Sequence, residues 1–136
     1  MSSLFVFVYG SLLPGQSNHH IIFPHLLACK EGWIAARLVD CGAYPAAVRD
    51  EIAIRRNSII RGQWIAVDRA GVAAMDRLEE FYGIEEQNDY ERVWLPDAKD
   101  ATIAGWSYVW ESTRGYPVVG LDYWPDYQAG KQRHRE

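Results

Sequence analysis

The fold is decided by the stretch Leu4-Phe5-Val6-Phe7-Val8-Tyr9-Gly10-Ser11-Leu12, near the start of the chain. Residues 4–9 are almost wholly apolar and rich in strand formers, so they predict a β-strand buried on both faces. Gly10 and Ser11 then end the strand with turn chemistry. Backbone N–H groups at such a strand end can bind an anion or an oxyanion. A plain connecting turn has the same sequence, and no Gly-x-Ser-x-Gly elbow surrounds Ser11, so both interpretations stay open.

The rest of the chain predicts an α+β fold built around this first strand. Ser17 or Asn18 is the expected cap of the first helix, which Pro24 disturbs, and Asp68 is the expected N-cap of the second. The expected strands are 4–9, 32–40, 44–49, 58–67, 90–95 and 102–110, and the expected helices are 18–28 and 69–81. Many short strands with two helices indicate a sheet that is curled or closed into a small mixed β-barrel.

Length and charge narrow the class of protein. A chain of 136 residues predicts a single domain, residues 1–130, followed by a basic tail, residues 131–136. The net charge of −4 disfavours nucleic-acid binding, since the negative body repels phosphate backbones. No stretch approaches the roughly 18 apolar residues of a membrane span, and no basic residue precedes the first apolar run as in a secretory signal. We therefore expect a cytoplasmic protein that contacts neither nucleic acid nor membrane.

One carboxylate of the second predicted helix falls on its apolar face. The apolar half of the helical wheel holds Val72, Ala74, Met75, Leu78, Phe81 and Tyr82. Glu79 lies inside that half, whereas Glu80 projects on the polar side. Burial raises the pKa of a carboxyl group, which is the condition for a general acid and base near neutral pH. The wheel alone leaves a second interpretation open, in which Glu79 reaches solvent or pairs with Arg92.

The sequence predicts no metal site and no cofactor. His19, His20 and His25 are close in sequence, but their spacing does not place two imidazoles on one helical face. Cys29 and Cys41 are the two cysteines and are expected to be reduced thiols. No phosphate-binding loop and no Gly-x-Gly-x-x-Gly motif occurs.

Five short motifs, taken in order, resemble those of the γ-glutamylcyclotransferase-like superfamily, in particular the γ-glutamylamine cyclotransferase and avirulence-induced-gene-like branch. They are Tyr9-Gly10-Ser11-Leu12, Gly42-Ala43-Tyr44-Pro45, Arg61-Gly62-Gln63-Trp64, Met75-Asp76-Arg77-Leu78-Glu79 and Tyr90-Glu91-Arg92. The resemblance covers residues 4–110. In this chain Glu80-Phe81-Tyr82 stand between the motif glutamate and Gly83, where the motif of the family usually runs directly from glutamate to glycine.

The resemblance implies a small mixed β-barrel flanked by two helices and an enzyme without a cofactor. The reaction is an intramolecular aminolysis, formally an acyl transfer, in which a small γ-glutamyl substrate cyclises to 5-oxoproline and releases a free amine. Glu79 is the implied catalytic proton shuttle. The implied substrate-binding residues are the backbone of Gly10, Ser11 and Leu12 together with Tyr9, Tyr44 and Tyr90. The leaving amine and the oligomeric state are not specified.

Two other functions remain open. The chain could be a non-catalytic module that binds a small carboxylate on the same fold. It could also be a protein-interaction domain that uses the aromatic residues of segment 115–127, which is expected to be irregular. The second alternative predicts that these rings form one contiguous exposed patch.

Overall fold

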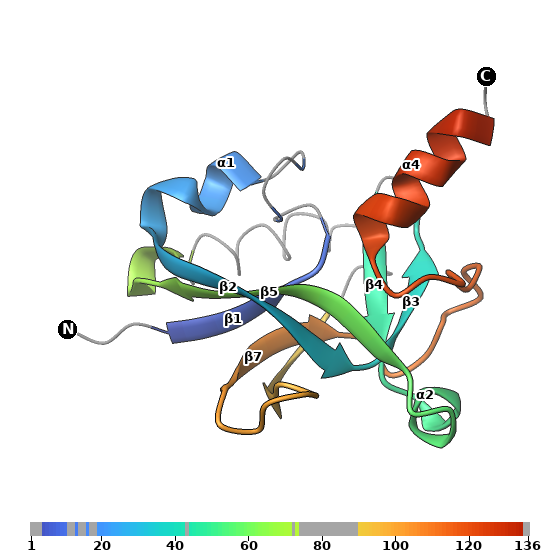
Figure 1. Cartoon of the computed structure of the whole chain (residues 1–136), viewed down its shortest axis with the longest axis horizontal. Coiled ribbons are helices and arrows are strands. Elements are labelled where there is room, and N and C mark those ends of the chain that lie inside the picture. Colours follow the sequence, from blue (N-terminus) through green and yellow to red (C-terminus); the bar gives the residue numbers. More distant parts are fainter. Residues whose placement is uncertain are drawn as a thin grey trace.

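The computed structural model describes residues 4–10, 13, 16, 19–42, 44–71, 73 and 90–134 (Figure 1). The strands are β1 (Leu4–Val8), β2 (Leu26–Ala35), β3 (Arg37–Asp40), β4 (Pro45–Val48), β5 (Ile59–Val67), β6 (Glu91–Pro96) and β7 (Ala104–Val109). The helices are α1 (His19–Ile22), the 3₁₀ turn η1 (Phe23–His25), α2 (Glu51–Arg55) and α4 (Trp124–His134). A further helical segment begins at Arg69, directly after Asp68.

The main sheet has five strands in the order β2-β5-β1-β7-β6. β1 lies at its centre, antiparallel to β5 and parallel to β7. The sheet is curled, as expected, and the α+β class is confirmed (Figure 1). The predicted closure into a barrel is wrong for the described residues, because β2 and β6 are the two outer strands and are not paired with each other.

Two glycines allow β1 to lie close to its neighbours. A Cβ atom at Gly62 on β5 would collide with the carbonyl oxygen of Val8, and one at Gly105 on β7 would collide with that of Phe5. Each glycine therefore removes a side chain where the backbone of β1 passes. The result is a densely packed centre in which Val6, Phe7 and Val8 are buried.

A second, two-stranded sheet is formed by β3 and β4 and joins the main sheet at the end of β7. The chain passes from β2 into β3 through the buried Ala36, so one extended segment serves both sheets. On the other side, the Trp110 N–H donates to the Ala47 carbonyl (2.8 Å), and the Arg49 N–H donates to the Trp110 carbonyl (2.9 Å). These two bonds fix the short sheet beside the carboxyl end of β7.

The C-terminal segment differs from the prediction. Residues 124–134 form helix α4, where an irregular segment ending at residue 127 and a tail from 131 were expected. Figure 1 shows α4 against the two-stranded sheet. The Tyr127 hydroxyl and the Lys131 ammonium both donate to the Asp40 carboxylate, at 2.8 and 2.9 Å. Burial alone would raise the pKa of Asp40, but these bonds and one from the Gly42 N–H lower it below its ordinary value.

The aromatic residues of this segment do not form an exposed patch. Trp124 is fully buried, Tyr123 and Tyr127 are partly buried, and Tyr116 packs against Trp110. The interaction-domain hypothesis required these rings to be exposed together, so its structural prediction is wrong.

The other differences concern short elements. The helix expected at 18–28 ends at Ile22, and Pro24 lies in the following 3₁₀ turn before β2 starts at Leu26. Helix α2 was not predicted; the Asp50 carboxylate caps it by accepting the Ala53 N–H at 3.0 Å. The number of helices therefore exceeds the two that were expected.

Asp97 is a buried carboxylate that fastens the turn after β6 to the core. It accepts hydrogen bonds from the Trp64 indole N–H and from the backbone N–H groups of Trp33, Lys99 and Asp100, all at 2.8–2.9 Å. Burial by itself would raise the pKa of this carboxyl group, but the four donors outweigh it and lower the pKa below 3.8.

We expect Asp97→Asn to lower the free energy of unfolding by about 1.5–3 kcal/mol at pH 7, because the charged acceptor of four donors is lost. Since the folded pKa is depressed, this contribution is present above the unfolded pKa and is lost as the pH falls through the folded value. Urea unfolding across pH 7 to 2 measures both effects. Asp122→Asn, at an exposed position, should change the stability by less than about 0.5 kcal/mol. An equal loss in both variants would contradict the assignment.

Candidate functional site

Four of the seven predicted site residues lie in the described part of the chain, namely Tyr9, Gly10, Tyr44 and Tyr90. The other three, Ser11, Leu12 and Glu79, lie outside the described residues.

The Tyr9 side chain joins the two sheets. Its hydroxyl donates to the Tyr108 carbonyl on β7 (2.6 Å) and accepts the Ala47 N–H from β4 (3.1 Å). All of these groups are buried. Tyr9 therefore fixes the end of β1 relative to β7 and β4, and with it the position of the next residue, Gly10.

Gly10 lies at a position that has no space for a side chain. A Cβ atom there would lie 2.8 Å from the Cδ and Cγ atoms of Pro45. The Gly10 carbonyl accepts the Leu13 N–H at 3.0 Å. The proline ring of β4 thus packs directly on Gly10, the first residue of the predicted anion-binding turn.

The Gly42–Pro45 motif forms the turn between β3 and β4. Gly42 has a φ of +101°, which favours glycine, and its N–H donates to the Asp40 carboxylate at 2.7 Å. The Cys41 N–H donates to the Tyr44 carbonyl at 3.0 Å. This turn holds the half-buried Tyr44 next to Pro45, and so next to Gly10.

Tyr90 approaches the same proline from the start of β6. Its hydroxyl donates to the Pro45 carbonyl at 3.1 Å, and its ring lies 5.4 Å from the ring of Trp110. Three motifs far apart in the sequence, those of Gly10, Pro45 and Tyr90, thus meet at one place in the fold.

An aromatic wall that the sequence analysis did not identify continues from Tyr90. The Trp110 ring lies 5.7 Å from that of Tyr116, and the guanidinium of Arg114 stacks on Trp110 at 4.1 Å from the ring centre. The only signal in the sequence is the density of aromatic residues near Gly115. Trp110 contacts Ala47 on β4 and Tyr90 just before β6, and these long-range contacts cannot be read from the sequence.

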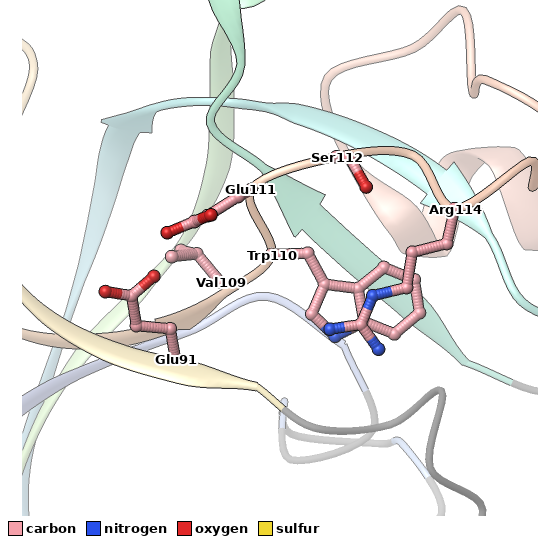
Figure 2. A pocket seen from close by; sticks show the side chains of 6 residues that line it. All are labelled: Glu91, Val109, Trp110, Glu111, Ser112 and Arg114. Carbon is pink, nitrogen blue, oxygen red and sulfur yellow. The ribbon is translucent and has the colours of Figure 1, made fainter.

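A cavity of about 290 Å³ opens beside this wall, where β6 starts and β7 ends. Figure 2 shows the carboxylates of Glu91 and Glu111 on one side of the cavity and the guanidinium of Arg114 on Trp110. Its lining residues are Glu91, Val109, Trp110, Glu111, Ser112 and Arg114.

The helix that was predicted to carry Glu79 starts as expected. Residues 69–71 and 73 are helical, and the Asp68 carboxylate accepts the Gly71 N–H at 2.7 Å, so Asp68 is the predicted N-cap. His25 lies 3.1 Å from the same carboxylate. The helix therefore begins directly after β5, the strand that pairs with β1.

Neither a metal cluster nor a membrane helix is found in the described ranges. No group of three or more His, Cys, Asp or Glu side chains there is arranged to hold a metal ion. Among the same residues, no helix is long and apolar enough to cross a membrane.

Comparison with known proteins identifies relatives over almost the whole chain. The family described as "Gamma-glutamyl cyclotransferase, AIG2-like" matches residues 6–126. The chain is 31% identical over 126 residues to the "Gamma-L-glutamyl-butirosin B gamma-glutamyl cyclotransferase" of Niallia circulans, covering 90% of this chain and 76% of that protein. The resemblance seen in the five motifs is confirmed.

Solved structures with the same fold include two that match nearly the full chain. Uncharacterized protein PH0828 from Pyrococcus horikoshii has a TM-score of 0.66 at 18% identity, covering 98% of this chain and 100% of that one. An AIG2-like protein from Mus musculus has a TM-score of 0.61 at 20% identity, covering 94% and 84%. At these identities the likeness shows the shared fold.

We expect Tyr9→Phe to lower the free energy of unfolding by about 1–3 kcal/mol, because it leaves the buried Tyr108 carbonyl and Ala47 N–H without this partner. Urea unfolding measures the change. Tyr116→Phe removes a hydroxyl that makes no hydrogen bond to the described residues, and should change the stability by less than about 0.5 kcal/mol. If both variants unfold at the wild-type urea concentration, the hydroxyl of Tyr9 does not hold the sheets together.

Proposed function

Since the chain belongs to the γ-glutamyl cyclotransferase, AIG2-like family and is an enzyme of that type, we propose that it releases 5-oxoproline and a free amine from a γ-glutamyl amine or γ-glutamyl amino acid, with Glu79 as the proton shuttle. The observation that carries this proposal is the meeting of the Gly10, Pro45 and Tyr90 motifs at one place.

The proposed reaction needs no other reactant. The substrate's α-amine attacks its own γ-carbonyl carbon, a C–N bond forms to close the five-membered ring, and the γ-amide C–N bond breaks. The α-ammonium group gives up two protons, and the departing nitrogen takes up two to leave as an ammonium group. Atoms and charge balance without water, and the nucleophile belongs to the substrate, so the protein supplies orientation and proton transfer.

Orientation comes from the turn at Gly10. We assign the backbone N–H groups of Gly10, Ser11 and Leu12 to the α-carboxylate of the glutamyl group. Pro45 packs on Gly10, and Tyr9 fixes the end of the strand before it. Since ring closure is intramolecular, holding the amine close to the γ-carbonyl supplies much of the rate gain. Tyr44 and Tyr90 form the neighbouring wall.

Proton transfer is assigned to Glu79. The helical wheel and the family motif select the same residue, and the observed N-cap at Asp68 supports the predicted start of its helix. The ionised carboxylate takes a proton from the α-ammonium group, and the protonated form delivers one to the departing amine. Burial of a carboxyl group raises its pKa toward the working pH, which is the condition for both steps.

We expect Glu79→Gln to lower kcat for 5-oxoproline release by about 10²- to 10⁴-fold, because glutamine transfers no proton. Glu80→Gln, the neighbouring carboxylate on the predicted polar side of the helix, is the matched control and should keep wild-type kcat. The assay incubates the protein with γ-glutamyl amines, γ-glutamyl dipeptides, glutathione and γ-L-glutamyl-butirosin B, and quantifies 5-oxoproline.

Two outcomes would contradict parts of this proposal. Full activity in Glu79→Gln would remove the assigned proton shuttle. Binding of a γ-glutamyl compound without any 5-oxoproline would instead support a non-catalytic module that binds small carboxylates.

The variant Gly10→Ala tests the proposed role of Gly10, which lies in the part of the site that the structure describes. The added Cβ meets the Pro45 ring at 2.8 Å, so the turn must shift. We expect kcat/KM to fall about tenfold or more, because small displacements of a positioned substrate are costly. Gly120→Ala, where a Cβ would meet nothing within 4 Å, should have wild-type kcat/KM. The double variant Gly10→Ala with Pro45→Ala should recover part of the lost kcat/KM. If Gly10→Ala and Gly120→Ala have the same kcat/KM, the substrate does not bind at Gly10.

A further inference from the structure

We propose that Tyr127 and Lys131 of helix α4 are positioning residues for the site of the glutamyl group. They act through the carboxylate of Asp40, which holds the turn that places Pro45 against Gly10. This inference rests on the proposed function, since it adds two residues to the machinery of that same site. Both residues lie outside the five sequence motifs, and neither is assigned a contact with the substrate.

Helix α4 holds its two donors in fixed places because its first residue belongs to the core. Trp124 is 1% exposed, and the Tyr127 ring lies 5.4 Å from the Trp124 ring. The Lys131 ammonium lies 5.7 Å and 5.6 Å from the centres of these two rings, within the range at which an aromatic face attracts a cation. Figure 1 shows α4 lying against the sheet of β3 and β4, so its donors reach the end of β3.

The Asp40 carboxylate bridges the helix and the turn. Its Oδ2 atom accepts the Tyr127 hydroxyl at 2.8 Å and the Lys131 ammonium at 2.9 Å, whereas its Oδ1 atom accepts the Gly42 N–H at 2.7 Å. The bond to Asp40 raises the pKa of Tyr127 above its ordinary value, so the hydroxyl stays a donor at neutral pH. The Asp40 side chain is largely buried, and bonds to a buried carboxylate are among the stronger hydrogen bonds of a protein.

Lys131 also contacts the turn directly, because its ammonium donates to the Gly42 carbonyl at 3.3 Å. Pro45 follows this turn and has no backbone N–H, so it cannot donate a bond to the ladder and depends on the turn for its place. Its ring leaves no room for a Cβ atom at Gly10, which would lie 2.8 Å away. A displacement of the turn therefore moves the Pro45 ring relative to Gly10.

The short sheet has other supports away from this turn. β3 pairs with β4 over four residue pairs, and the Trp110 N–H donates to the Ala47 carbonyl at 2.8 Å. The bonds from α4 act at the opposite end, on Asp40 and Gly42. We therefore expect loss of the Lys131 ammonium to shift the turn while the sheet stays folded.

Removal of the Lys131 ammonium tests the positioning role. We expect Lys131→Met to lower kcat/KM for 5-oxoproline release about five- to twentyfold, because a displaced turn orients the substrate less well. Tyr127→Phe should lower it about two- to fivefold, and Lys131→Arg, which keeps a cationic donor for Asp40, should lie within about twofold of wild type. The matched control is Lys99→Met, at an exposed lysine in the turn after β6, which should keep the wild-type kcat/KM.

A double-mutant cycle shows whether Lys131 acts through Gly10. Lys131→Met added to Gly10→Ala should lower kcat/KM by less than about twofold further, because both changes disturb the same contact with Pro45. A residue that only stabilises the fold would lower kcat/KM by the same factor in both backgrounds.

Hydrogen exchange measures the same link without a substrate. The Leu13 N–H donates to the Gly10 carbonyl at 3.0 Å, so its exchange rate reports on Gly10. We expect exchange at Leu13 to be about tenfold faster in Lys131→Met than in the wild type. The Asp97 N–H, which donates to the Ile103 carbonyl at 2.7 Å, is the internal reference and should exchange at the wild-type rate.

Each outcome decides a different statement. Wild-type kcat/KM in Lys131→Met, a full loss in the Gly10→Ala background, or wild-type exchange at Leu13 would overturn the positioning role, while 5-oxoproline release still supports the proposed function. If the wild-type protein releases no 5-oxoproline, the proposed function is overturned, whereas faster exchange at Leu13 in Lys131→Met still supports the link from α4 to Gly10.

Discussion

The structure depends on the hydroxyl of Tyr9. This single group donates to Tyr108 on β7 and accepts from Ala47 on β4, so it ties the central strand of the main sheet to the strand beside it and to the second sheet. Because the hydroxyl is buried, both bonds form away from water, and loss of either would leave a buried polar group unpaired. The backbone of Gly10 follows directly and is placed against Pro45 by the same two bonds.

The candidate site therefore lies at the seam between the two sheets. Its parts come from the end of β1, the turn before β4, the start of β6 and the end of β7, and none of these elements forms the site alone. Long-range contacts of this kind hold a binding geometry more firmly than one loop would. The Tyr90 hydroxyl on the Pro45 carbonyl and the Trp110 backbone on Ala47 are two such contacts, and each joins segments more than forty residues apart.

The sequence predicted correctly those elements that depend on residues close together in the chain. The apolar run of β1, the alternating β5 and the cap at Asp68 all follow from residue spacing and turn chemistry. The start of β2 was mistaken for helix because residues 27–31 lie exposed beside β5 and show no alternation. Helix α4 was missed because its position depends on Asp40, nearly ninety residues earlier. Tyr9, Gly10 and Tyr90 were found through motifs, whereas the Trp110–Arg114 stack follows only from the packed fold.

In the proposed reaction, only the residues that contact the leaving amine can differ between relatives without affecting ring closure. Ring closure uses the substrate's own amine, so the glutamyl half must always meet the same turn and the same proton carrier. The amine half takes no part in forming the ring, and its contacts are free to differ between relatives. Loops at the ends of strands can change their side chains without altering strand pairing, so contacts to the leaving amine that lie on such loops can differ between relatives at little cost to the fold.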